Sequence, residues 1–413
     1  MRSACGAAAA GARGAHEAIF GQHLPMDGAR ASRVAAVLLW FGLLAVPVFA
    51  VDVARFHAAT DFRCFYTAAR MVASAEDPYD AGAWNAAMGG PAPDRRGIVQ
   101  PPPCPGRFAY PLWTALLLLP LGLLPAAWSA AIWVTLLLGG ALVGAMLTWR
   151  VVAPSHASPL GFLALVAASE PFGLTLANAQ LGGLLFGLCG LVVWLGGRRR
   201  PSAGIALGLL AIKPHITFVT LAATWVWMSR RLRTATLTAG ALLLALFLFT
   251  TLLRPAWPLE WLSELSAPER SAIAYNHATS WHLAEMLGLP ACAAVLVVGP
   301  LVAALGRHAI RPDAPLIHVV AASLVCGLVI APYAGSYDQL LLAVAWGCSL
   351  AVARSTNGAM RRALVTALVT SVPLLSWPLF VISETLTALI PIATGVMLYV
   401  ASRASRARDV SRT

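Results

Sequence analysis

Residues 181–214 read LGGLLFGLCGLVVWLGGRRRPSAGIALGLLAIKP, and this stretch decides the fold class. Residues 181–197 carry no charged side chain, three arginines follow, and a second uncharged apolar run occupies 203–212. An apolar run that ends in a short arginine cluster is typical of a helix that crosses a membrane with its basic end in the cytoplasm. The stretch therefore predicts two membrane helices joined by a basic cytoplasmic turn.

The composition of the whole chain agrees with this prediction. Of the 413 residues, 59% are apolar and only 11% are charged. Soluble domains carry roughly 25% charged residues, so this chain has too few charges to build a water-soluble surface. The same composition excludes a disordered protein, a coiled coil and a collagen. The net charge of +12 is therefore a topology signal and does not indicate a nucleic-acid partner, because basic residues of membrane proteins collect in short cytoplasmic loops.

Apolar runs recur along the chain, and we expect about twelve crossings. They are residues 34–53, 127–149, 159–177, 181–197, 203–212, 216–228, 235–253, 291–305, 314–330, 340–353, 363–380 and 386–400. The apolar segment 112–125 is bracketed by prolines, and we expect it to lie at the outer interface without crossing. Counting it as a crossing would place the arginine clusters after residues 197 and 229 outside, whereas leaving it out puts every short arginine-rich loop and both termini inside.

The predicted architecture is an all-α polytopic bundle over residues 33–402. A disordered cytoplasmic tail is expected at 1–32 and a basic cytoplasmic tail at 403–413. Two long extracytoplasmic loops remain, 52–125 and 254–290, and long loops in a compact bundle usually carry function.

The first long loop holds an amphipathic pattern and two cysteines. Phe62, Phe65 and Ala69 share one face at helical spacing, which predicts a helix over 61–74 that suits the membrane surface. Cys64 and Cys104 are able to pair if this loop is extracytoplasmic, but the sequence does not fix their separation.

Polar residues gather on the extracytoplasmic side of the predicted bundle. They are Asp61, Asn178, Gln180, Lys213, Asn276, His277, Tyr337 and Asp338. Each also has an ordinary structural reading. Asp61 and Asp338 suit helix caps, Asn178 and Gln180 suit an interfacial turn, and a histidine in a long loop is commonly a solvated surface residue.

Lys213 is harder to explain structurally, because it is the only lysine in the chain and every other strong base is arginine. It lies at the outer turn of a hairpin of short apolar runs, where a cation is costly and functional by default. A compact ammonium on a flexible stem suits a phosphate. The alternative is a lysine that snorkels to the interface.

The order of several short motifs resembles a known family. They are Asp61-Phe62-x-x-Phe65-Tyr66, Asp77-Pro78-Tyr79, Phe108-Ala109-Tyr110-Pro111, Asn178-x-Gln180, Gly204…Lys213-Pro214 and Tyr337-Asp338. In this order and on this side of the membrane, over roughly 34–353, they resemble glycosyltransferase family 87. Its members are polyprenyl-phosphate-mannose-dependent α-1,2-mannosyltransferases of the GT-C fold.

The resemblance implies an inverting, metal-independent enzyme without a cofactor in a bacterial-type plasma membrane, with its active site facing the extracytoplasmic side. It would transfer a hexose, mannose in the family, from a polyprenyl-phosphate donor to a hydroxyl of a cell-envelope glycolipid or glycan. Asp61 matches the family's general base and Lys213 its phosphate-binding Lys-Pro. The substrate-binding residues that it implies are Lys213, Tyr66, Tyr110, Asn178, Gln180, Asn276, His277, Tyr337 and Asp338.

Two departures leave the sugar and the acceptor open. Leu112 stands where the family commonly has a second proline, and Asn276-His277-Ala278-Thr279-Ser280 only loosely follows the family's second-loop signature.

The other acidic residues of the first loop have structural readings. Asp77 and Asp80 flank Pro78-Tyr79 and suit a turn, and Asp94 is followed by two arginines that neutralise it. Asp61 alone lies where the chain leaves its first crossing, at the membrane surface where a lipid-linked phosphate must sit.

Two other classes fit a chain of this composition. A transporter or flippase of lipid-linked sugars would show inverted repeats with broken helices in corresponding halves, and the sequence shows one broken hairpin, at Lys213, without a counterpart. A structural membrane subunit would leave Asp61 and Lys213 without a role.

Overall fold

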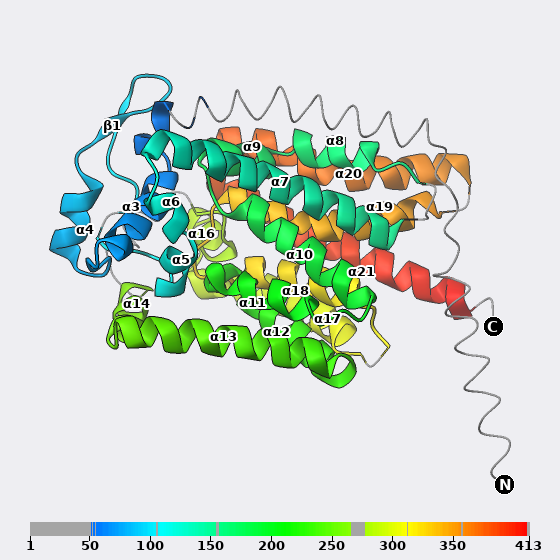
Figure 1. Ribbon diagram of the computed structural model, residues 1–413. Helices are drawn as coiled ribbons and strands as arrows, with labels where there is room; N and C mark the ends of the chain where they lie inside the picture. Colours follow the sequence, from blue (N-terminus) through cyan, green and yellow to red (C-terminus); the bar gives the residue numbers. More distant parts are fainter. Residues whose placement is uncertain are drawn as a thin grey trace, which may run out of the picture.

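A computed structural model shows the chain as a bundle of helices that run side by side (Figure 1). The structure describes residues 51–410 except 52, 54, 105, 154–156, 266–276, 312 and 357, and at 265, 308 and 404–410 it describes the backbone alone. The elements are η1 (His57–Ala59), α3 (Phe62–Ala73), α4 (Ala81–Met88), β1 (Ala92–Pro93), β2 (Val99–Gln100), α5 (Leu112–Leu117), α6 (Leu119–Gly122), α7 (Ala126–Val152), α8 (Leu160–Ala168), α9 (Glu170–Ala177), α10 (Gly182–Gly197), α11 (Ala203–Leu209), η2 (Leu210–Ile212), α12 (Pro214–Arg231), α13 (Arg233–Leu253), α14 (Trp257–Leu265), α16 (Ser280–Met286), η4 (Ala291–Ala294), α17 (Val295–Ala309), α18 (Leu316–Ile330), η5 (Ser336–Leu342), α19 (Ala343–Arg354), α20 (Ala359–Ile382), η6 (Glu384–Ala388) and α21 (Leu389–Val410). Within the described residues the only sheet is the antiparallel pair β1–β2, so the predicted all-α class is confirmed.

Among the residues that the structure describes, five helices are long and apolar enough to cross a membrane. They are α7, α13, Ser336–Arg354, α20 and Glu384–Arg403. With 27 residues, α7 is about 40 Å long, which exceeds the roughly 30 Å of a bilayer's hydrocarbon core. Two bent pairs raise the number to as many as seven, α8 with α9 at 62° and α16 with Ala291–Arg307 at 118°. These helices indicate a membrane protein, while the twelve crossings stay a prediction.

Three of the predicted segments need separate comment. The run 159–177 is broken, because Ser169 is extended and Pro171 begins a new helix near its first position, where its missing N–H costs no hydrogen bond. The backbone of α21 is helical to Val410, through most of the predicted tail at 403–413. The tail 1–32 and almost all of the first run, 34–53, lie outside the described residues.

The amphipathic helix predicted at 61–74 is present as α3, and protein covers its apolar face. Phe62, Phe65 and Ala69 are at most 1% exposed, and α3 packs on α5, α6 and α7. The helices α5 and α6 have 6 and 4 residues, so neither is long enough to cross a membrane.

The helices α7 and α10 approach each other closely. A Cβ at Gly183 would lie 2.2 Å from the carbonyl oxygen of Leu137, so only glycine permits this contact. The contact brings the turn between α9 and α10 against α7, where the Trp133 indole N–H donates to the carbonyl of Ala179 at 2.8 Å.

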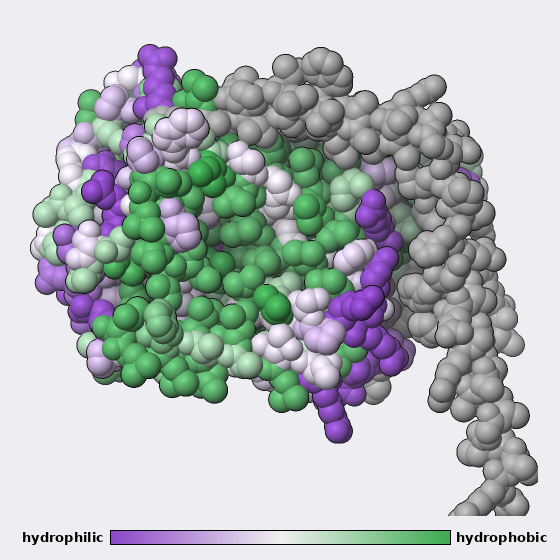
Figure 2. Space-filling model, viewed as in Figure 1, coloured by the Kyte–Doolittle hydropathy of each residue, from purple (hydrophilic) through white to green (hydrophobic). Residues whose placement is uncertain are grey.

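The bundle has two unlike ends (Figure 1). The helices α3 and α4 and the β1–β2 hairpin lie at one end, which we call the loop end. The helices α7, α10 and α19 finish at the opposite end, each with an arginine, Arg150, Arg198 and Arg354, and we call this the arginine end. Figure 2 shows a broad hydrophobic band between hydrophilic side chains at the two ends.

Candidate functional site

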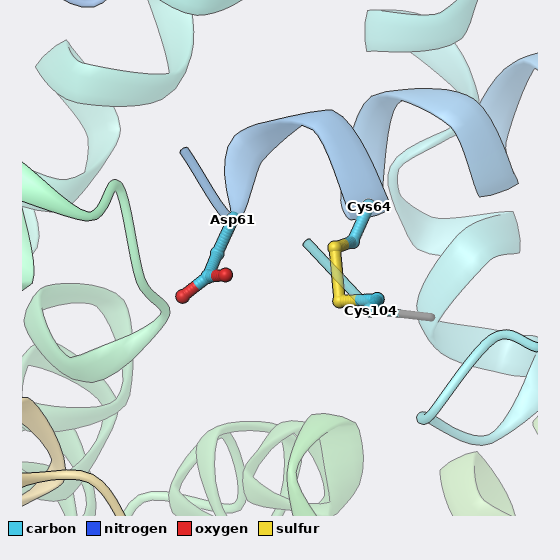
Figure 3. A group of neighbouring side chains, drawn as sticks. All are labelled: Asp61, Cys64 and Cys104. Atoms are coloured by element: carbon cyan, nitrogen blue, oxygen red, sulfur yellow. A yellow bond between two sulfur atoms is a disulfide. The ribbon is translucent and has the colours of Figure 1, made fainter. Parts of the chain in front are cut away.

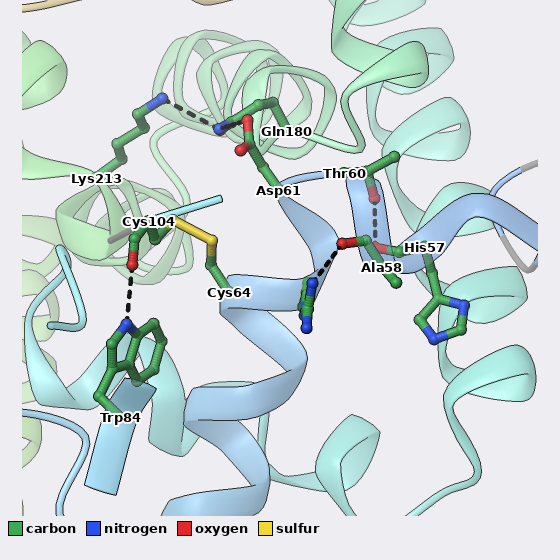
Figure 4. The surroundings of a disulfide bond; sticks show 10 residues. His57, Ala58, Thr60, Asp61, Cys64, Trp84, Cys104, Gln180 and Lys213 are labelled. Atoms are coloured by element: carbon green, nitrogen blue, oxygen red, sulfur yellow. Dashed lines mark hydrogen bonds between the residues drawn. A yellow bond between two sulfur atoms is a disulfide. The ribbon is translucent and has the colours of Figure 1, made fainter. Parts of the chain in front are cut away.

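Asp61 occupies the N-cap position directly before α3, but its side chain accepts no capping hydrogen bond. The Asp61 N–H donates to the carbonyl of Asn178 at 3.1 Å, and its Oδ2 accepts a hydrogen bond from Gln180 Nε2 at 2.6 Å. The carboxylate is therefore turned toward the turn between α9 and α10 (Figure 4), and capping does not account for it.

Gln180 joins Asp61 to a buried ion pair. Lys213 Nζ donates to Asp338 Oδ1 at 2.6 Å and to Gln180 Oε1 at the longer distance of 3.4 Å. The side chains of Lys213 and Asp338 are 2% and 1% exposed, and Nζ lies 5.0 Å from the centre of the Tyr337 ring. A snorkelling lysine would hold its ammonium in water, so the structure excludes that alternative for Lys213.

The turn that carries Gln180 is strained. Ala179 has φ +54°, in the left-handed region, which costs a residue with a Cβ roughly 1–2 kcal/mol. Hydrogen bonds hold the backbone on both sides of this residue. The Asn178 carbonyl accepts from the Asp61 N–H, and the Ala179 carbonyl accepts from the Trp133 indole N–H. Strain of this kind persists only where the surroundings impose it, and here it aims Gln180 at the carboxylate and the ammonium.

The cluster of Asp61, Gln180, Lys213 and Asp338 carries a net charge of about −1 when all its ionisable groups are charged. Burial raises the pKa of Asp61, the Gln180 hydrogen bond and the Lys213 charge lower it by less, and the Asp338 charge raises it further. A raised pKa makes the ionised carboxylate a stronger proton acceptor. Asp61 is thus available as a proton acceptor, whereas the Asp338 carboxylate is paired with the Lys213 ammonium.

Asp61 is the member of this cluster that borders an open pocket. The pocket has a volume of about 920 Å³ and lies between the start of α3, the β1–β2 hairpin and the end of α9. Its polar lining consists of Thr60, Asp61, Asn85, Asp94, Arg95, Arg96, Gln100 and Asn178. Ligand sites commonly have volumes of roughly 300–1,000 Å³, so the pocket is large enough for a small sugar.

The structure brings some of the remaining predicted residues to the cluster and places others elsewhere. Asn178 contributes its carbonyl to Asp61 and its side chain to the pocket. Tyr110 is buried, and its ring centre lies 5.1 Å from that of Phe65. Tyr66 instead packs toward α6, because its hydroxyl donates to the carbonyl of Leu124 at 2.9 Å. Asn276, which was also predicted, lies outside the described residues.

His277 belongs to a row of rings that runs from Tyr110 through His215 and Tyr333. The ring centres of Tyr110 and His215 are 6.3 Å apart, those of His215 and Tyr333 4.2 Å, and those of Tyr333 and His277 6.3 Å. Burial, together with the neighbouring His282, lowers the pKa of His277 to about 4, so its imidazole is neutral at neutral pH. Sequence reasoning missed His215 and Tyr333, although His215 follows Lys213-Pro214 directly.

Cys64 and Cys104 form a disulfide beside Asp61 (Figure 3). It ties α3 to the proline-rich segment that borders the pocket, and the Trp84 indole donates to the Cys104 carbonyl at 2.8 Å. The two sulfurs and a carboxylate oxygen of Asp61 lie within 4.8 Å of one another, the spacing of a metal site. Sulfurs bonded to each other are not thiolate ligands, so with the disulfide intact this group does not offer a metal its donors.

Asp77 and Asp80, the two acidic residues of the first loop for which a turn was predicted, have structural roles. Asp77 accepts the Tyr79 N–H at 2.9 Å, and Asp80 caps α4. The Tyr79 hydroxyl donates to the Tyr110 carbonyl at 2.6 Å. This hydrogen bond joins the Asp77-Pro78-Tyr79 motif to the Phe108-Ala109-Tyr110-Pro111 motif. Arg254 forms ion pairs with Asp77 and with Glu260 on α14, and so joins the start of the second loop to the first.

Comparison with known proteins agrees with the motif order. No curated protein and no solved structure matches the chain. The family model of glycosyltransferase family 87 matches residues 108–334, more than half of the 413 residues. This range contains Gln180 and Lys213, while Asp61 and Asp338 lie outside it. The resemblance predicted from the sequence is therefore confirmed, and the chain belongs to glycosyltransferase family 87 as a membrane glycosyltransferase.

Proposed function

We propose that the enzyme transfers a hexose, specifically mannose, from a polyprenyl-phosphate donor to a hydroxyl of a cell-envelope glycolipid or glycan. The reaction would be inverting and metal-independent, at the extracytoplasmic face of the plasma membrane. The observation that carries the proposal is the connection of Asp61 to Lys213 through Gln180 at the loop end. The family match supports the class of reaction.

Asp61 is the general base in this proposal. The acceptor hydroxyl enters from the pocket that Asp61 borders, and its oxygen attacks the anomeric carbon of the donor sugar. The hydroxyl proton passes to the Asp61 carboxylate, which must come within about 2.6–3.2 Å of the attacking oxygen. The hydrogen bond from Gln180 to Oδ2 fixes the orientation of the carboxylate for this transfer.

Lys213 stabilises the leaving group. As the bond from the anomeric carbon to the phosphate oxygen breaks, negative charge grows on the polyprenyl phosphate, and a fixed ammonium lowers the energy of that transition state. In the resting cluster this ammonium is paired with Asp338. Because the cluster already carries net negative charge, the phosphate has to share or displace Asp338, which makes Asp338 a positioning residue for Lys213.

The test is transfer by the purified protein in lipid nanodiscs. Polyprenyl-phosphate mannose, polyprenyl-phosphate glucose and a nucleotide-linked mannose, each radiolabelled, are offered with an envelope glycan fraction from cells that lack the protein. We expect label in the glycan from polyprenyl-phosphate mannose alone, with the anomeric configuration opposite to that of the donor, and unchanged by a chelator.

Each other outcome contradicts a stated part. Transfer from the nucleotide-linked mannose would contradict the polyprenyl-phosphate donor. Preferred transfer from polyprenyl-phosphate glucose would contradict mannose as the sugar. Loss of transfer in the presence of a chelator would contradict metal independence. In sealed proteoliposomes, donor that changes sides without forming a glycan bond would indicate a flippase instead.

A further inference from the structure

A second cavity lies between α12, α17 and α18, away from the cluster. It has a volume of about 360 Å³ and a lining that is almost wholly apolar. Leu305, Ser323 and Cys326 form its buried floor, and Phe218 of α12 and Ile310 after α17 form walls that are exposed at the surface of the bundle. It is therefore a groove that opens sideways, where a bilayer would meet the protein.

One end of this groove is basic. Arg230 and Arg231, in the last turn of α12, line it together with Arg311 from the connection between α17 and α18. Arg231 is held in place, because it donates to the carbonyl of Ala314 at 3.1 Å, and Arg311 pairs with the exposed Asp313 at 3.2 Å. Three guanidinium groups face one carboxylate, so the mouth is net positive. Figure 2 shows hydrophilic side chains gathered where α10 and α17 reach the arginine end.

We propose that this groove binds an anionic phospholipid of the leaflet at the arginine end. One acyl chain lies on the apolar floor, and the headgroup phosphate meets Arg230 and Arg311. Charge complementarity selects this occupant, because an apolar groove alone accepts any acyl chain, whereas a guanidinium cluster favours a lipid with net negative charge. The site is separate from the cluster, since the 18 residues of α12 place its two ends about 27 Å apart, and it does not rest on the proposed function.

Gly306 offers a way to close the groove without disturbing the fold. It lines the groove, and a Cβ built there meets no atom within 4 Å, so Gly306→Leu puts an isobutyl group into open space. Gly139→Leu is the matched control, because Gly139 is also helical and open but belongs to α7. For the headgroup, Arg230→Gln/Arg311→Gln removes two charges, and Arg361→Gln/Arg362→Gln removes two at the start of α20, outside the groove.

The experiment is native mass spectrometry of the full-length protein titrated with phosphatidylglycerol, phosphatidylcholine or a polyprenyl phosphate. We expect the wild type to retain phosphatidylglycerol preferentially. The Arg230/Arg311 double variant should bind it roughly 30-fold more weakly. Gly306→Leu should lose that site for both phospholipids, and both controls should match the wild type.

Three results overturn the inference. They are equal retention of the two phospholipids by the wild type, unchanged binding by both groove variants, and a polyprenyl phosphate that displaces phosphatidylglycerol from this site. Thermal unfolding of each variant without added lipid shows whether it is folded. If Gly306→Leu does not fold, the double arginine variant alone still decides the headgroup preference.

Discussion

The two ends of the bundle use positive charge in opposite ways. At the loop end a single lysine is buried, with its ammonium 2.6 Å from Asp338. At the arginine end guanidinium groups lie over indole rings, Arg198 4.0 Å from the centre of Trp194 and Arg354 4.7 Å from that of Trp149. A buried ammonium is costly and depends on its partner, whereas an arginine over tryptophan keeps its charge near water at little cost. The contrast supports the proposal that the reaction takes place at the loop end, while the arginines anchor the opposite end.

The largest effect on turnover should come from Asp61→Asn, because the amide keeps the shape of the side chain but cannot accept the proton. We expect turnover to fall about 10²–10⁴-fold, with donor binding nearly unchanged. The measurement is initial rate with a polyprenyl-phosphate sugar. Asp313→Asn, which changes an exposed acid at the arginine end, is the matched control and should keep full turnover. Near-normal turnover of Asp61→Asn would end the assignment.

The raised pKa of Asp61 adds a stability test to the same variant. A carboxyl whose pKa is higher in the folded state favours folding below its unfolded pKa, and this contribution is lost as pH rises through the folded pKa. At neutral pH the ionised side chain is then a net cost. Asp61→Asn should therefore melt at or above the wild-type temperature at neutral pH. A clearly lower melting temperature would mean that lost activity reflects lost structure.

Lys213→Gln should have the next largest effect. In the proposed reaction it removes the charge that meets the leaving phosphate, so we expect turnover to fall about 10²–10³-fold and the donor KM to rise. Lys213→Arg should rescue only in part, because the guanidinium is planar and larger. Steady-state kinetics with varied donor concentration measures both parameters.

A double variant separates chemistry from stability in this result. Lys213→Gln leaves Asp338 buried without its cation, and breaking such a pair costs up to about 3–5 kcal/mol. Lys213→Gln/Asp338→Asn should recover much of that stability and none of the turnover. Recovery of turnover in the double variant would show that the ion pair is structural only.

Gln180→Met should have a smaller effect with a distinctive pH signature. It keeps the volume but removes the hydrogen bond that lowers the pKa of Asp61. The acid limb of the kcat/KM profile should therefore move to higher pH, with about tenfold lower turnover at neutral pH. Gln339→Met is the control. It removes the buried hydrogen bond that Gln339 donates to the carbonyl of Thr387, and it should leave the acid limb of the profile unchanged. If the acid limb of Gln180→Met did not shift, Gln180 would have no influence on the proposed base, Asp61.

The sequence predicted the membrane class, α3, the family and the grouping of Asp61, Gln180, Lys213 and Asp338 on one side. Arginine distribution and motif order are enough for these, because both are visible along the chain. It did not predict that Gln180 bridges Asp61 and Lys213. That contact depends on the left-handed φ of Ala179 and on the close approach at Gly183, which come from packing between distant segments. The ring row through His215 and Tyr333 was missed for the same reason.

The smallest effect should come from an arginine anchor. Arg354 ends α19 and lies over Trp149, whose ring is buried and stacks on Phe162. Arg354→Gln removes the cation while the indole stays packed, so we expect a loss of about 0.5–1 kcal/mol in stability and no change in turnover or donor KM. Thermal unfolding and steady-state kinetics of the same preparation measure both. The variant is informative because it removes one positive charge, as Lys213→Gln does, at the other end of the bundle. If its turnover fell as far as that of Lys213→Gln, net charge and not the position of the ammonium would govern the reaction, and the contrast between the two ends would fail.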